Sequence, residues 1–137
     1  MKSNSIWQPP HPRVHNELDF NISDPNLYNC AVFRYTRSLR HLIVAVHAQV
    51  NNPKPAFCLS FESVWYFQGP MSWVSVDFEL SDTGERKKLL QKGIVEVADN
   101  MIDAFAQQHE LFTIRKPAFN IQILAGNCAI LENISPL

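Results

Sequence analysis

Three neighbouring segments of the chain alternate between apolar and polar residues: HLIVAVHAQV (41–50), FCLSFESVWYF (57–67) and SWVSVDFEL (72–80). A period of two residues is typical of β-strands that bury one face. A further strand-like segment over 30–36 precedes them, and short turn-forming sequences join each segment to the next. The sequence therefore predicts an antiparallel β-meander of about four strands.

The apolar residues of these strands also indicate a register. If the connecting turns are symmetric, Val46 lies opposite Phe61, and Phe61 lies opposite Phe78. The same register places Trp65 opposite Val74, so the apolar faces of three strands coincide. A slip of one residue would move a whole set of side chains to the other face. We therefore expect a sheet with one apolar and one polar face.

A helical pattern follows the strands. Asp82 and Glu85 have the spacing of a capping box, which marks the start of a helix. Apolar residues then recur every three or four positions over 84–109, as on one face of an amphipathic helix. This predicts one long helix packed on the apolar face of the meander. Gly93 can divide this helix in two, and the alternative is a short strand over 93–97.

The last part of the chain predicts a C-terminal β-hairpin. Two apolar runs, 119–124 and 127–132, are separated by Gly126-Asn127, a turn-forming pair. The expected fold class is therefore α+β, with the helix covering the sheet.

The domain organisation follows from the proline content of the N-terminus. Residues 1–27 contain four prolines and predict an extended arm, whereas 28–137 predict a single α+β domain. The few apolar residues of the arm can dock on this domain or on a second subunit. They are Ile6, Trp7, Leu18, Phe20 and Ile22.

Charge and glycine content exclude several classes of function. The 137 residues include 12 basic and 13 acidic side chains, which give a net charge of −1. This balance argues against nucleic-acid binding and against a polybasic membrane-surface protein. The four glycines are too far apart to form a phosphate loop or a dinucleotide-binding turn. We expect no cofactor.

Cysteine usage and hydropathy indicate the compartment. The N-terminus lacks the apolar core of a signal peptide, and no uncharged stretch is long and apolar enough to cross a bilayer. Three widely spaced cysteines, an odd number, are typical of free thiols rather than of a disulfide framework. We therefore expect a cytoplasmic protein with no membrane partner.

Aromatic residues crowd around the turn between the third and fourth strands. The expected register places Tyr66 and Trp73 opposite one another on the polar face, beside this turn. Large amphipathic rings at the surface anchor interfaces because they bury much area at a small entropic cost. The alternative is a cross-strand pair that only stabilises the hairpin.

A second group of polar residues shares the same expected face. Glu62 lies opposite Asp77, and Ser60 lies between His47 and Glu79 in this register. Opposed residues have Cβ atoms about 4.5–5.5 Å apart, so the two carboxylates could share a proton or a metal ion. The alternative is the ordinary solvated face of an antiparallel sheet. The spacings of known zinc and nucleophile motifs are absent, so we expect no metal site.

These observations favour a non-enzymatic binding or interaction module whose partner is a protein, in particular a second copy of the chain in a homodimer. Tyr66 and Trp73 are its expected binding residues. The alternative is a small metal-dependent or acid–base enzyme that uses the carboxylate and histidine patch. A small apolar ligand between helix and sheet stays open as a third hypothesis. The cations of Arg86-Lys87-Lys88 are expected to form a solvated helix face.

Overall fold

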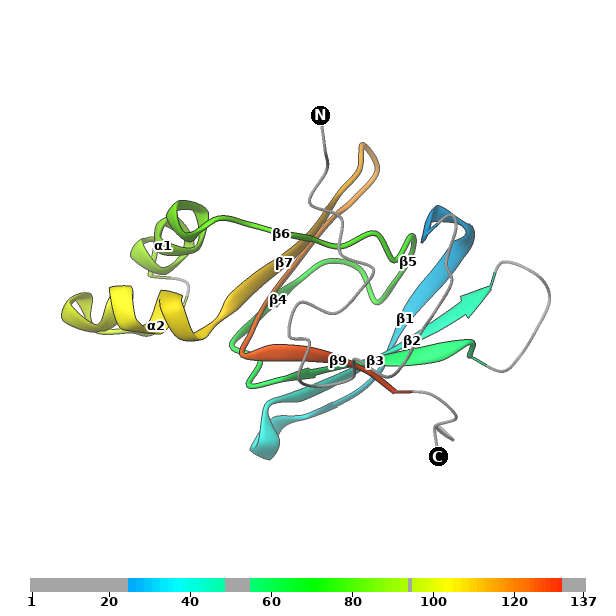
Figure 1. Cartoon of the computed structure of the whole chain (residues 1–137), viewed down its shortest axis with the longest axis horizontal. Helices are drawn as coiled ribbons and strands as arrows, with labels where there is room; N and C mark the ends of the chain where they lie inside the picture. Colours follow the sequence, from blue (N-terminus) through cyan, green and yellow to red (C-terminus); the bar gives the residue numbers. More distant parts are fainter. Residues whose placement is uncertain (1–24, 49–54, 94, 132–137) are drawn as a thin grey trace.

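The computed structural model describes residues 25–48, 55–93 and 95–131, and within them the chain has the predicted α+β class. Nine antiparallel strands form two sheets, and two short α-helices lie beyond one end of them (Figure 1). The predicted arm over 1–27 lies outside the described residues except for Pro25–Leu27, a single 3₁₀ turn. No helix in the described part of the chain is long and apolar enough to cross a membrane.

The first sheet has five strands in the order β5-β1-β2-β3-β9. The strands are β1 (Tyr28–Thr36), β2 (His41–Ala48), β3 (Phe57–Glu62), β5 (Ser72–Val74) and β9 (Asn127–Leu131). The turn between β1 and β2 is a 3₁₀ helix over Arg37–Leu39, and it ends at Arg40, which has a left-handed backbone conformation. The successive pairing of β1, β2 and β3 agrees with the predicted meander.

The second sheet has four strands in the order β4-β8-β7-β6. These strands are β4 (Tyr66–Gln68), β6 (Glu79–Leu80), β7 (Glu110–Arg115) and β8 (Asn120–Ala125). The predicted hairpin about Gly126-Asn127 is wrong, because β8 and β9 do not pair with each other. The hairpin of this region is formed by β7 and β8 instead.

Three bends carry the chain from one sheet to the other. They lie at Ser63 between β3 and β4, at Ser75 between β5 and β6, and at Gly126 between β8 and β9. Ser63 has φ 55° and Ser75 has φ 118°, which non-glycine residues adopt rarely. The Gly126 N–H donates to the carbonyl oxygen of Glu62 at 2.8 Å, which ties two bends together. Strands that switch sheets in this way make the corners of orthogonal sheet packings.

The bends overturn the second half of the predicted meander. The segments 57–67 and 72–80 are not hairpin partners: β5 pairs with β1, and β6 belongs to the other sheet. Phe61 and Phe78 nevertheless meet, because their ring centroids lie 5.7 Å apart across the two sheets. Phe61 pairs with Leu42 rather than with Val46, a shift of an even number of residues, so the predicted faces are kept.

The single long helix is also wrong, whereas the division expected at Gly93 is confirmed. Helix α1 (Thr83–Gln91) ends before Gly93, which has φ 77°, and helix α2 (Ile102–Gln108) follows a 3₁₀ turn over Asp99–Met101. The described residues of this segment, 93 and 95–97, form no strand, so the alternative of a strand over 93–97 is wrong as well. The predicted cap is confirmed, because the Asp82 carboxylate accepts from the Glu85 N–H at 2.8 Å.

The helices do not cover the face predicted for them. The apolar face of the five-stranded sheet packs on the four-stranded sheet, and the main core lies between the two. Both helices instead pack on the opposite face of the four-stranded sheet, where Leu89, Leu90, Ile102 and Ala106 surround Leu111 and Leu124. We call these two sides of the four-stranded sheet its inner face and its helix-side face.

Candidate binding cleft

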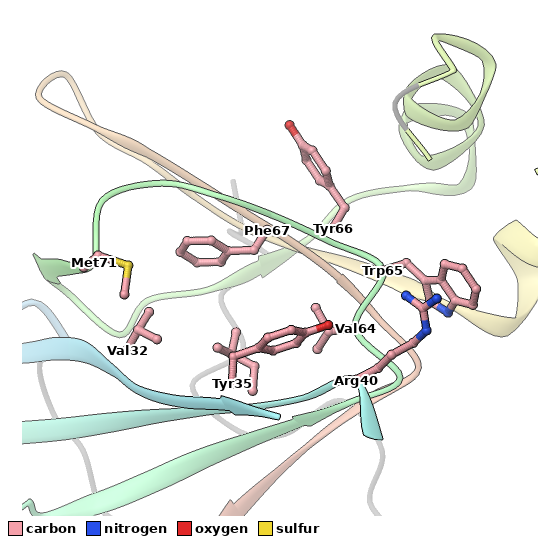
Figure 2. Close-up of a pocket in the computed structure, with 9 residues that line it drawn as sticks. Val32, Tyr35, Arg40, Val64, Trp65, Tyr66, Phe67 and Met71 are labelled. Carbon is pink, nitrogen blue, oxygen red and sulfur yellow. The ribbon is translucent and has the colours of Figure 1, made fainter. Parts of the chain in front are cut away.

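A cleft of about 350 Å³ opens between β1 and β4, at the side where the two sheets do not meet (Figure 2). Its lining is almost wholly apolar or aromatic: Val32, Tyr35, Arg40, Leu42, Val64, Trp65, Tyr66, Phe67 and Met71. Figure 2 shows Val32 and Tyr35 on one wall and Phe67 and Met71 on the other. Concave apolar sites with few polar groups are the usual form of a binding site.

Both walls of the cleft are open strand edges. Strand β5 pairs only with residues 29–31 of β1, and the last contact is a hydrogen bond from the Val32 N–H to the Met71 oxygen at 2.8 Å. Beyond it, no described strand lies beside the outer edge of β1. Among the described strands, β4 likewise pairs only with β8, along one of its edges. An open edge presents N–H and C=O groups that can accept another strand.

A β-bulge brings Tyr35 to the cleft. The register between β1 and β2 shifts between Val32 and Arg34, which makes Phe33 an extra residue. In an unbroken strand Arg34 would share a face with Val32. The bulge puts Tyr35, rather than Arg34, on the same face as Val32, so Tyr35 lines the cleft and Arg34 does not. The alternating sequence pattern contains no signal for this change, so sequence analysis missed Tyr35.

Arg40 supplies the single charge of the cleft lining. Its guanidinium lies 3.5 Å from the centroid of the Trp65 ring, a cation–π contact. The Arg40 carbonyl accepts from the Val64 N–H at 2.8 Å, so the turn after β1 is tied to the bend after β3. The Trp65 ring packs in turn against Phe105 of α2, with centroids 5.3 Å apart. One end of the cleft is therefore cationic and held in place.

The structure separates the two predicted binding residues. Tyr66 is half-buried and lines the cleft, and its hydroxyl donates to Gln68 Oε1 at 2.8 Å. Trp73 is only 5% exposed, and its indole N–H donates to the Ser75 oxygen at 2.9 Å. The expected face-to-face pair does not form, because the strands that carry the two rings are not neighbours. Trp73 instead lies in the core beneath the cleft and packs against the Phe67 ring, with ring centroids 6.5 Å apart.

The structure does not bring together the predicted carboxylate and histidine patch. Glu62 lies opposite Asn127 in the five-stranded sheet, not opposite Asp77. Glu79 lies in the other sheet, 3.9 Å from an Arg115 nitrogen, and His47 pairs with a residue at the start of β1. Within the described residues no three metal-ligating side chains gather. His41, rather than His47, contacts Ser60, with Nε2 2.5 Å from Oγ.

The cysteines offer no reactive thiolate. Cys30, Cys58 and Cys128 are free and buried. Burial raises the pKa of each thiol above its ordinary value. Because the thiolate is the nucleophilic form, these side chains act as small apolar core residues.

Comparison of the chain with protein-family models, with curated proteins and with solved structures found no match. The function must therefore be argued from the cleft itself.

Proposed function

We propose that this chain is a non-enzymatic protein-interaction module whose aromatic cleft holds an extended segment of a partner protein, in the first instance a second copy of the chain. The observation that carries the proposal is the position of the cleft between two open strand edges. An extended segment placed there gains backbone hydrogen bonds from an edge, and its side chains enter the apolar lining. This is the logic of strand addition.

Exposed apolar side chains around the cleft support this proposal. Met71 is 65% exposed and Tyr35 is 45% exposed, and both line the cleft. Single exposed apolar residues are ordinary, but a group of them beside an apolar cleft is typical of an interaction site. Tyr66 borders the cleft from β4, although its ring is directed away from Tyr35 and Phe67 (Figure 2), and Trp73 packs against Phe67 from the core.

Charge favours a partner segment with an acidic group beside its apolar side chain. Arg40 is the cation of the lining; Arg34 on β1, which is directed away from the cleft, and Arg37 in the following turn are also exposed. None of the three has a carboxylate partner in the described part of the chain. A homodimer related by a two-fold axis would bury the same apolar patch on both subunits. We place this association in the cytoplasm, where the three thiols stay reduced.

The test is the solution mass by light scattering over a range of concentrations. We expect a wild-type dimer that Met71→Asp and Tyr35→Ala convert to monomer, because the first places a charge in the cleft and the second removes apolar area from it. The matched control is Met101→Asp, since Met101 is also an exposed methionine, 52% exposed, but lies away from the cleft. Trp73→Ala is unsuitable, because truncating a buried ring destabilises the core.

Three results would count against the proposal. A monomer at every concentration would contradict self-association. A dimer that survives Met71→Asp would place the interface elsewhere. Binding of an apolar dye by a monomer, abolished in Met71→Asp but kept in Met101→Asp, would assign the cleft to a small ligand instead. Thermal unfolding of each variant shows that its fold is intact.

A further inference from the structure

A second concavity lies on the helix-side face of the four-stranded sheet. It has a volume of about 270 Å³ and is formed where α1 leaves part of the strands uncovered. Its lining comes from one helix and three strands: Tyr66, Gln68, Glu85, Lys88, Leu89, Lys92, Leu111, Arg115 and Gln122. We call it the basic hollow. It is separate from the aromatic cleft, although Tyr66 borders both.

The charges of the basic hollow are unbalanced. Lys88 lies in the last turn of α1 and Lys92, four residues on, is its C-cap residue, and Arg115 reaches the hollow from β7. Glu85, the single carboxylate of the lining, is engaged by Arg115 with N and O atoms 3.0 Å apart. Among the residues that the structure describes, neither lysine has an acidic partner. Two like charges at this helical spacing repel each other, and a bound anion would relieve the repulsion.

Neighbouring Lys87 shows that this arrangement is particular to the hollow. Its ammonium contacts Asp103 of α2 at 2.8 Å, on the side of α1 that faces the second helix. Arg86 is buried and is bound by Glu110 at 3.1 Å and by backbone oxygens. The three consecutive cations that were expected to form a solvated face therefore differ: Arg86 is buried, Lys87 is paired with Asp103, and of the three only Lys88 lines the hollow.

Neutral donors and an apolar floor complete the basic hollow. The Tyr66 hydroxyl donates to Gln68 Oε1 at 2.8 Å, so the amide nitrogen of Gln68 is left to donate to a ligand. Gln122 lies on β8 beside Gln68 of β4, with which it pairs. Leu89 and Leu111 are buried below these polar groups. Several donors that converge from different elements suit a tetrahedral anion with several oxygens, and the floor suits an attached apolar group.

We propose that the basic hollow binds a small phosphorylated molecule, with the phosphate between Lys88, Lys92 and the glutamine amides. The lysine ammonium is a compact charge with three N–H donors. It can therefore bind a phosphate from several directions, whereas arginine binds best through two parallel hydrogen bonds in one plane. The volume of about 270 Å³ fits one phosphate with a short apolar group. This site goes beyond the proposed interaction function and does not depend on it.

The experiment is a titration of the ¹⁵N-labelled chain with phenyl phosphate, followed by two-dimensional NMR. We expect the side-chain NH₂ signals of Gln68 and Gln122 to shift more than in sodium chloride of the same ionic strength. Lys88→Gln combined with Lys92→Gln should weaken binding about tenfold or more, since hydrogen bonds to charged groups are lost. Lys87→Gln, with its ammonium directed at Asp103, is the matched control and should bind within about twofold of wild type.

Three results would overturn the proposal. The first is that neither glutamine shows a shift specific to phosphate. The second is that the double variant Lys88→Gln/Lys92→Gln shows the same shifts as wild type. The third is that inorganic phosphate binds as tightly as phenyl phosphate. The last result would reduce the hollow to a site for a bare anion. The spectra themselves report whether each variant is folded. Because Met71→Asp lies in the cleft and outside the hollow, it should keep phenyl phosphate binding even if self-association is lost.

Discussion

The two faces of the four-stranded sheet are made by the same strands and differ in what covers them. On the inner face, Phe112, Ile114, Ile121 and Ile123 are buried along the whole length of β7 and β8. On the helix-side face, Leu111 and Leu124 are buried, whereas Gln122 is half-buried and Arg115 is exposed. A second sheet covers the inner face along β7 and β8, but two helices of nine and seven residues cover only part of the other face.

The covered inner face therefore stabilises the fold, and the partly covered helix-side face is available for binding. Residues that are enclosed on all sides hold the sheets together, but no ligand can reach them. The incompletely covered face leaves polar and charged side chains around an apolar floor, which is the composition of a binding site. The aromatic cleft also arises from incomplete cover. The edges of β1 and β4 do not meet, so apolar side chains between the two sheets reach solvent there.

The largest expected effect contrasts two neighbouring residues of β8. Ile123→Ala leaves a cavity in the inner core and should lower the free energy of unfolding by about 2–5 kcal/mol. Gln122→Ala, on the helix-side face, should change it by less than about 0.5 kcal/mol. Urea unfolding of both variants measures the contrast. Similar losses in the two variants would show that the helix-side face is part of the scaffold.

The second effect is alkaline destabilisation through the thiols of the inner core. Cys30 and Cys128 belong to this core, and burial raises the pKa of both thiols. Above about pH 8.5 the unfolded chain releases these protons while the folded chain keeps them. The free energy of unfolding should therefore be unaffected below that pH and should fall above it, by about 1.4 kcal/mol per pH unit for each thiol.

The control for this pH dependence is Cys128→Val, which removes one thiol and keeps an apolar side chain of similar size. Urea unfolding between pH 7 and pH 10 should show a shallower decline in this variant than in wild type. Equal declines would mean that the thiol of Cys128 ionises as readily in the folded chain as in the unfolded one.

Local patterns in the sequence predicted the elements of this fold better than their partners. Alternation identified the segments that form β1, β2 and β3, and the Asp82 cap marked the start of α1, because both features depend on residues close in the chain. Strand β7 was not predicted, and the segments 57–67 and 72–80 are each divided between the two sheets. The bends at Ser63 and Ser75 were missed, since serine carries no signal for a positive φ. Gly126 was interpreted as part of a hairpin turn, but it lies where the backbone passes close to Ser63. A Cβ added at Gly126 would lie 3.1 Å from the Cβ of Ser63.

The candidate sites were predicted only in part for the same reason. Tyr66 was identified from the aromatic crowding around its turn, but its partners in the cleft depend on which strands are neighbours. The bulge at Phe33 reverses the faces of the following residues, and alternation alone cannot indicate it. Lys88 and Lys92 were part of an ordinary charged helix in the sequence. Only the placement of α1 over β4 and β8 distinguishes them from Lys87.

The smallest expected effect concerns the stability of the basic hollow. Lys88→Gln and Lys92→Gln should each change the free energy of unfolding by less than about 0.5 kcal/mol, because two opposing contributions nearly cancel. Mutual repulsion of the lysines destabilises α1, whereas cations near its C-terminus interact favourably with the helix dipole. Urea unfolding at low and high salt measures the balance, since both contributions are screened. A loss of about 1 kcal/mol or more in the free energy of unfolding would mean that these lysines stabilise the fold. Unchanged stability together with weakened phosphate binding would mean that the two unpaired cations serve ligand binding.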